Sequence, residues 1–296
     1  MAHDHAHEIP SHNRAFAIGV ALNVAFIIIE VAYGVMADSL ALLADAGHNI
    51  SDVLGLLLAW GASALAIKPA TWTHSYGYRR ATILASLASA MLLFVAIGGI
   101  TWEAIQRLQS PAATHGTTIL VVAGIGVFIN AATAALFVKG QEDLNIKRAF
   151  LHMAADAAVS LGVVLAGLGM IYTGWLWLDP AMSLVIAAVI LWSTWGLFRD
   201  SFNLAMDRVP KGLSLPDIAS HLGGFEGVVD VHDLHVWAVS TTDTALTVHL
   251  VMPHPGTDAF LARVAEEMHE HFGIGHTTVQ IETNSAQCPQ AQEMTF

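Results

Sequence analysis

The chain has 296 residues, of which 55% are hydrophobic and only 12% are charged. This charged share is about half that of a soluble domain, so the composition indicates a membrane protein. The formal net charge is −12, which argues against a nucleic-acid partner. The single cysteine, Cys288, excludes an internal disulfide framework and a cysteine-rich zinc module, so we expect imidazoles and carboxylates to bind any metal.

A polar, histidine-rich tail opens the chain at residues 1–14. Its potential metal ligands are His3, Asp4, His5, His7, Glu8 and His12. The tail lacks the basic n-region of a secretory signal. It either collects metal ions weakly or carries its histidines incidentally, and the sequence leaves both interpretations open.

Six apolar segments follow, each long enough to cross about 30 Å of hydrocarbon. We expect membrane helices at approximately residues 15–36, 39–67, 81–108, 117–138, 149–172 and 174–198. The first two are joined only by Ala37 and Asp38, so they should form a tight hairpin. The last two are joined by a similar turn near Thr173-Gly174.

The basic residues predict how these helices are oriented. Eleven of the 12 fall on one side of the six segments, and only Arg107 falls on the other. The eleven are Arg14, Lys68, Arg79, Arg80, Lys139, Lys147, Arg148, Arg199, Arg208, Lys211 and Arg263. The positive-inside rule makes that side cytoplasmic, so both termini should lie inside the cell.

The second apolar segment carries three titratable residues, Asp45, His48 and Asp52. Steps of three and four residues place them on one face of a helix. A charge at the bilayer centre costs at least about 2.5–3.5 kcal/mol, so such residues need a reason to be there. They form either a polar patch satisfied by neighbouring helices or a metal or proton site completed from elsewhere in the chain.

The fifth segment supplies matching residues, because His152 and Asp156 repeat the His-x-x-x-Asp spacing of His48 and Asp52. Two such helices facing one another would present two imidazoles and two carboxylates, the tetrahedral set that Zn²⁺ accepts. Four protein ligands leave no open position for a reactive water, which disfavours hydrolysis. Asp45 has no counterpart one turn before His152, so we expect a proton-relay or access-path role rather than a metal ligand.

Other polar residues in the apolar segments are Asn23, Glu30, Glu103 and Asn130. Interhelical hydrogen bonds, or an interfacial position for Glu103, explain most of them. Glu30 is left with two interpretations, because a buried carboxylate can also relay protons.

The last third of the chain is acidic, with 12 acidic residues against three basic ones from Ser201 to Phe296. From about residue 209 it reads as a separate domain with the order α-β-β-α-β, which suits a small α+β sandwich. The expected elements are residues 215–222, 228–238, 245–252, 258–272 and 277–282.

Eight histidines lie in this domain. Those on or beside the expected strands are His232, His235, His249 and His276, with Glu282 on the last strand. They form either a regulatory metal site or the ordinary surface of an acidic domain. We expect nothing beyond solvent exposure for His115 and His221, and the lone His74 is weak support for a metal site.

Four motifs together resemble one known family. They are Ser39 to Asp52, Tyr76-Gly-Tyr-Arg-Arg80, His152 to Asp156, and His232-Asp-Leu-His-Val-Trp237. Over essentially its whole length the chain is similar to the cation diffusion facilitators, which are metal-ion/proton antiporters, and more narrowly to their zinc-transporting branch. The loop from Gln141 to Arg148 lacks the His-rich insertion of many eukaryotic members.

The resemblance implies a membrane all-α domain of six helices followed by a cytoplasmic α+β, ferredoxin-like (metallochaperone-like) domain. It implies a homodimer in which each protomer uses His48, Asp52, His152 and Asp156 as transport ligands. For the C-terminal domain it favours His232, His249 and Glu282, while Gln280 stands where relatives carry histidine. We expect a tail at 1–14, the membrane domain at 15–208, the cytoplasmic domain at 209–284 and a second tail at 285–296.

The predicted function is proton-coupled efflux of Zn²⁺, with Cd²⁺, Co²⁺ and Ni²⁺ as further substrates and no organic cofactor. The partners would be divalent metal ions, protons, membrane lipid and a second copy, and the location a bacterial cytoplasmic membrane. Two alternatives are a metal sensor that does not transport and a membrane metalloenzyme. The enzyme lacks support because the chain has no His-Glu-x-x-His motif.

Overall fold

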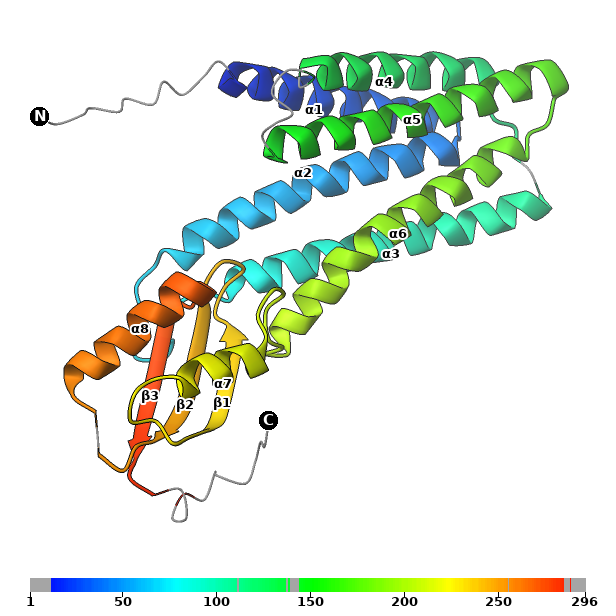
Figure 1. Cartoon of the computed structure of the whole chain (residues 1–296). Helices are drawn as coiled ribbons and strands as arrows, with labels where there is room; N and C mark the ends of the chain where they lie inside the picture. Colours follow the sequence, from blue (N-terminus) through cyan, green and yellow to red (C-terminus); the bar gives the residue numbers. More distant parts are fainter. Residues whose placement is uncertain are drawn as a thin grey trace, which may run out of the picture. The chain divides into compact units, whose positions relative to one another are not determined.

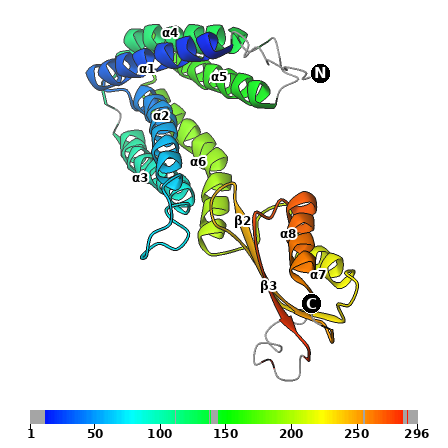
Figure 2. The same ribbon diagram turned by 90° about the vertical axis from the view of Figure 1, so that its left-hand side faces the viewer.

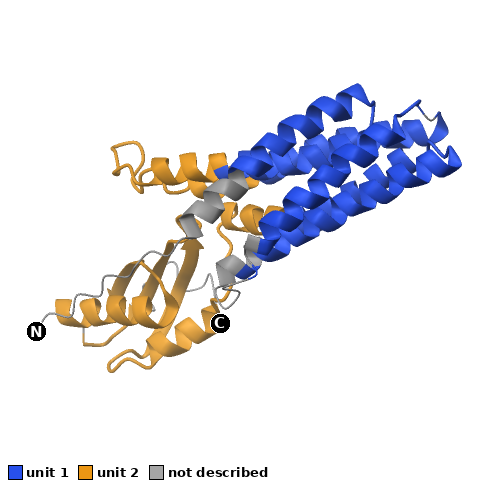
Figure 3. Cartoon of the chain, turned by 90° about the horizontal axis from the view of Figure 1, so that it is seen from above, with its two compact units in different colours: residues 1–56, 89–195 blue, residues 57–88, 196–296 orange. Residues whose placement is uncertain are grey.

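The computed structural model of the chain describes residues 12–110, 112–136, 138, 144–254, 256–284 and 288. The histidines before residue 12, which the sequence singled out, lie outside this part. The chain divides into two compact units, one of Met1–Leu56 with Ser89–Trp195 and the other of Leu57–Ala88 with Gly196–Phe296 (Figure 3). The expected domain boundaries near residues 15, 209 and 285 stay predictions.

Six long helices precede a small C-terminal domain, in agreement with the expected fold class (Figure 1). They are α1 (His12–Met36), α2 (Leu40–Ala66), α3 (Ala81–Gln109), α4 (Gly116–Leu136), α5 (Leu144–Thr173) and α6 (Leu178–Ala205). Within the described residues, α2 to α6 each hold a stretch long and apolar enough to cross a membrane, and α1 holds a shorter apolar stretch, Ala21–Met36.

The start of α6 differs from the expected one, since the helix begins at Leu178 rather than near residue 174. Its second residue, Asp179, is buried and binds the first turn of α2. The carboxylate accepts hydrogen bonds from the Ser39 hydroxyl, from Leu40 N at 2.8 Å and from Ala41 N at 3.3 Å. A hydrogen bond to a charged group contributes about 1.5–3 kcal/mol, so this cap fixes where α6 begins against α2.

Helix α5 is positioned by close packing against α4. A Cβ atom on Gly167 would lie 3.1 Å from Leu120 N and 3.3 Å from Gly116 O, tighter than ordinary contacts. Small residues at such a crossing let two backbones approach closely, as is typical of membrane helices. Helix α1 packs on α4 as well, so α1, α4 and α5 lie together in both views (Figures 1 and 2).

The outer surfaces of the long helices carry large apolar side chains. Examples more than 70% exposed are Trp60, Val95, Phe128 and Trp192. Exposed side chains of this kind are unfavourable in water and favourable against lipid tails. This surface and the apolar length of the helices agree with a membrane protein.

The C-terminal domain has the order predicted from the sequence. Its elements are α7 (Leu215–Gly223), β1 (Asp230–Ala238), β2 (Thr244–Val251), α8 (Asp258–Phe272) and β3 (His276–Glu282). The sheet order is β1-β2-β3, with β1 antiparallel and β3 parallel to β2. Helices α7 and α8 cover one face of the sheet (Figure 2). Their contacts form a core that includes Ile218, Leu222, Leu246, Val248, Leu250, Val264 and Met268.

The segment between α2 and α3 contacts the C-terminal domain within the second compact unit. Arg80 Nη2 lies 2.6 Å from Asp207 Oδ1, just after α6. The Tyr76 ring meets the His276 ring edge-on, with 5.5 Å between the centroids. The Tyr-Gly-Tyr-Arg-Arg motif therefore joins the end of α2 to the sheet.

Candidate metal centre

Helices α2 and α5 bring the two His-x-x-x-Asp pairs together in the first compact unit. His48 Nε2 lies 3.7 Å from Asp52 Oδ2 and 3.5 Å from Asp156 Oδ1. His152 Nε2 lies 3.1 Å from Asp52 Oδ2 and 3.7 Å from Asp156 Oδ2. Each imidazole thus stands between one carboxylate of its own helix and one of the partner helix.

The separations between imidazole and carboxylate atoms are close to those within a metal coordination shell. In a tetrahedral zinc site with bonds of about 2.0–2.2 Å, neighbouring ligand atoms are about 3.3–3.6 Å apart. The four nitrogen–oxygen separations, 3.1–3.7 Å, are close to this spacing, with His48 facing Oδ1 of Asp156 and His152 facing Oδ2. Asp156 Oδ2 is buried and has no hydrogen-bond donor in the described part of the chain, so it is available to a cation.

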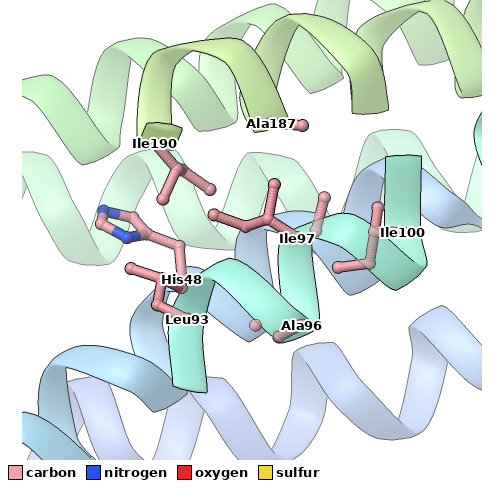
Figure 4. Close-up of a pocket in the computed structure, with 9 residues that line it drawn as sticks. His48, Leu93, Ala96, Ile97, Ile100, Ala187 and Ile190 are labelled. Carbon is pink, nitrogen blue, oxygen red and sulfur yellow. The ribbon is translucent and has the colours of Figure 1, made fainter. Parts of the chain in front are cut away.

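The four side chains differ in their access to the surroundings. Asp156 and His48 are 4% and 16% exposed, whereas Asp52 and His152 are 37% and 45% exposed. Behind His48 lies a cavity of about 10 Å³ whose lining is apolar, with Leu93 of α3 and Ile190 of α6 beside the ring (Figure 4). The site is therefore closed on the His48 side and accessible beside His152.

Asp45 and Glu30 are buried one step away from this site. Asp45 Oδ2 accepts a hydrogen bond from Ser160 at 3.0 Å, and Glu30 Oε2 accepts one from Asn49 at 3.4 Å. The two carboxyl groups are also close enough to interact electrostatically. Since Ser160 follows Asp156 by one turn, these groups form a polar extension of the centre.

Of the remaining polar residues of the long helices, Asn23 and Glu103 form ordinary hydrogen bonds. Asn23 donates to Met153 Sδ at 3.5 Å. Arg107 donates to Glu103 Oε1 at 3.0 Å and to Asp38 Oδ1 at 2.8 Å. Asn130 is buried and its side chain has no hydrogen bond within the described residues.

A second cluster lies in the C-terminal domain and contains three of the expected ligands. Glu282 Oε2 lies 3.3 Å from His232 Nε2, and Glu282 Oε1 lies 3.1 Å from His249 Nδ1. The sulfur of Cys288 lies 3.6 Å from His249 Nδ1. One ligand atom from each of the four residues falls within 4.8 Å of the others, which fits a single metal ion.

The local electrostatics favour the anionic form of Glu282. Burial opposes ionisation of this carboxyl, but hydrogen bonds from Cys288 and Gln280 and the nearby imidazoles of His232 and His249 outweigh it. Together they lower the pKa of Glu282 below its usual value. A carboxylate that is already ionised needs to release no proton when it binds a cation.

His235 and His276 do not join this cluster. His235 is exposed and lies 2.9 Å from Asp233, in an irregular stretch of β1 where Asp233 adopts φ +49°. His276 begins β3 rather than preceding it. Six residues separate it from Glu282, about 20 Å along an extended strand. Strand positions that share a face can still lie too far apart to share an ion.

Cys288 is the residue that sequence reasoning missed. Its single occurrence excludes disulfides, and the sequence predicts that imidazoles and carboxylates alone bind metal. This prediction is wrong for the cluster in the C-terminal domain, where the Cys288 sulfur lies beside His249. The cysteine follows β3 by six residues and belongs to no spacing motif, so only the return of the chain to His249 reveals it. A sulfur ligand makes this cluster softer than the one between α2 and α5.

Long apolar helices, an intramembrane set of imidazoles and carboxylates, and an acidic α+β domain define a class of membrane proteins that handle metal cations. Comparisons with known proteins agree. A family model described as the cation efflux transmembrane domain matches residues 16–204, and one described as the cytoplasmic domain of cation efflux proteins matches residues 210–284. The chain belongs to this cation efflux family, as its motifs predicted.

Individual relatives are similar over nearly the whole chain. The metal cation efflux system protein CzcD of Cupriavidus metallidurans is 36% identical over 98% of this chain and 93% of its own length. The cadmium, cobalt and zinc/H(+)-K(+) antiporter of Bacillus subtilis is 33% identical over 95% of this chain and 92% of its own. The zinc transporter ZitB of Escherichia coli is 34% identical over 95% and 93%, respectively.

Proposed function

We propose that the protein exports divalent metal cations, chiefly Zn²⁺, from the cytoplasm in exchange for protons. The observation that carries this proposal is the ring of two imidazoles and two carboxylates between α2 and α5, with its four separations of 3.1–3.7 Å. His48, Asp52, His152 and Asp156 would hold the transported ion. The relatives named as metal efflux proteins and as an antiporter support the same function.

The ligand set favours zinc among the common divalent ions. Two imidazoles with two carboxylates suit Zn²⁺, Co²⁺, Cd²⁺ and Ni²⁺, whereas a harder all-oxygen set would suit Mn²⁺ or Mg²⁺. The transport site holds no sulfur ligand, which disfavours Cu(I). The names of the relatives mention zinc, cadmium and cobalt, in agreement with this choice.

Proton exchange follows from the same ligands. Imidazole binds a metal ion only when neutral, and its reference pKa near about 6.5 makes protons and metal compete at physiological pH. In the outward-facing state, protonation of His48 or His152 would help to expel the ion. Glu30 and Asp45 are buried carboxyl groups beside the site, so this pair is suited to pass protons to it.

We further propose six membrane crossings with both termini in the cytoplasm, since eleven of 12 basic residues fall on one side of the helices. The protein would act as a homodimer in a bacterial cytoplasmic membrane, with one transport site in each protomer. The match of residues 210–284 to the cytoplasmic domain of cation efflux proteins, a domain named for dimerisation, supports the dimer.

Metal bound by the C-terminal cluster would regulate transport. His232, His249, Glu282 and Cys288 would take up Zn²⁺ when its cytosolic concentration rises, which offsets part of the domain's negative charge and favours its association with a second copy. The contacts of Tyr76 and Arg80 with this domain provide a route to α2, the helix that carries two transport ligands.

The proposed function is tested with inverted membrane vesicles from cells that produce the protein. The vesicles should accumulate Zn²⁺, Cd²⁺ and Co²⁺ and exclude Mn²⁺, because the site favours borderline metals. A sensor would bind metal without accumulation inside the vesicles, and an enzyme would cleave a peptide without moving metal. Either result would contradict the proposal.

The C-terminal cluster makes a separate spectroscopic prediction, because Cys288 is the only thiol in the chain. Titration with Cd²⁺ should produce a near-ultraviolet thiolate-to-metal band, and His249→Ala should raise the Cd²⁺ concentration needed for it at least about tenfold. Cys288→Ser supplies the baseline without a thiol. If His249→Ala leaves the titration unchanged, Cys288 and His249 do not share an ion.

A further inference from the structure

A third group of metal-binding side chains lies on the helical layer of the C-terminal domain, where the sequence suggested no role. His221 is in the last turn of α7, and Glu267 and His271 are one turn apart at the end of α8. His221 Nε2 lies 2.7 Å from Glu267 Oε2, and His271 Nε2 lies 4.0 Å from the same oxygen. The three ligand atoms all fall within 4.8 Å of one another.

This group is separate from the cluster around His249. Leu246, Val248 and Leu250 of β2 point into the core beneath α7 and α8. His249 alternates with them and therefore faces the other side of the sheet. The helix-layer group and the His249 cluster thus lie on opposite sides of the domain and cannot share an ion.

The neighbouring aromatic rings hold His221 in place. Its ring meets Phe225 edge-on at 5.8 Å and Phe272 edge-on at 5.4 Å between centroids. The guanidinium carbon of Arg263, on α8, lies 5.5 Å from the centre of the Phe225 ring. The ring of His221 is therefore oriented towards Glu267, a requirement for a preformed ligand.

We propose that His221, Glu267 and His271 form an additional binding site for a borderline divalent metal ion such as Zn²⁺, Co²⁺ or Ni²⁺. Two imidazole nitrogens and one carboxylate oxygen are three of the four ligands of a tetrahedral site, and a water molecule completes the set. The half-exposed position makes the site accessible, and the acidic domain attracts cations to it. An ion bound here links α7 to α8.

The alternative is that Glu267 only pairs with His221 and that His271 is an ordinary surface residue. Histidine footprinting of the full-length, otherwise unchanged protein separates the two. The protein is treated with diethyl pyrocarbonate with and without Zn²⁺, and modification of each histidine is measured by peptide mass spectrometry. His269, exposed in the same turn of α8, is the internal control.

Zn²⁺ should protect His271 and His221 at least about tenfold more than His269, because a metal-bound imidazole nitrogen cannot react. Glu267→Gln, which keeps a hydrogen-bond partner for His221, should raise the Zn²⁺ concentration for half-protection at least about tenfold. Equal modification of His271 and His269 with Zn²⁺ present would overturn the proposal. Unchanged protection in Glu267→Gln would overturn it as well.

Discussion

Alanine at Asp52 or at His152 is expected to abolish metal accumulation in vesicles, with at least about a 100-fold loss of initial rate. Each substitution removes one of the four proposed ligands. It also breaks the contact between Asp52 Oδ2 and His152 Nε2, which lie 3.1 Å apart. Loss of even an outer-shell partner of a metal ligand costs about 10–100-fold, and loss of a ligand costs at least as much. Initial rates of ⁶⁵Zn²⁺ uptake measure the effect.

The matched control for these variants is His115→Ala. His115 is an exposed histidine just before α4 and contacts none of the four proposed ligands. It should transport at the rate of the unchanged protein. Size-exclusion chromatography should show the same oligomer for all three variants, so that a loss of rate reports the site rather than the fold. Full transport by Asp52→Ala or His152→Ala would remove these residues from the transport site.

The second large effect is the dependence of uptake on a proton gradient. Inverted vesicles with an acidic interior should accumulate Zn²⁺ at least about tenfold faster than vesicles whose gradient has been dissipated by nigericin. The reason is that protons bind the imidazoles on the acidic side and displace the metal ion there. The protons dissociate from the imidazoles on the other side, where metal can bind again.

The carboxyl pair provides an internal check on this coupling. Glu30→Gln should lower the stimulation by the gradient more than it lowers Zn²⁺ binding, because Glu30 is buried beside Asp45 and accepts its hydrogen bond from Asn49 rather than being one of the four proposed ligands. Uptake at the same rate with and without the gradient would rule out proton exchange and leave a passive or differently coupled transporter.

Much of the fold could be predicted from hydropathy and charge, because a bilayer imposes long apolar helices. The ends of the helices were harder. Helix α6 starts at Leu178, and its second residue, Asp179, caps α2 through a contact between residues about 140 positions apart that no local pattern encodes. Helix α5 begins at Leu144, before the apolar stretch itself, since a helix can continue into polar sequence once its core is packed.

The candidate sites also differ in how far the sequence predicts their residues. His48, Asp52, His152 and Asp156 were predictable because helical spacing puts each pair on one face and the pair repeats. Cys288 and the group of His221 with Glu267 were not, since each depends on chain segments that approach only in the folded domain. Sequence reasoning finds ligands that share an element and misses those that meet only through tertiary structure.

The claim that four side chains of α2 and α5 hold the transported ion is tested most directly by zinc X-ray absorption. The sample is the full-length protein with His232→Ala, His249→Ala and Glu267→Gln, loaded with one Zn²⁺ per chain. The spectrum should show two imidazole nitrogens and two oxygens at about 2.0–2.2 Å and no sulfur. A sulfur ligand, or the same spectrum after addition of His152→Ala, would contradict the account.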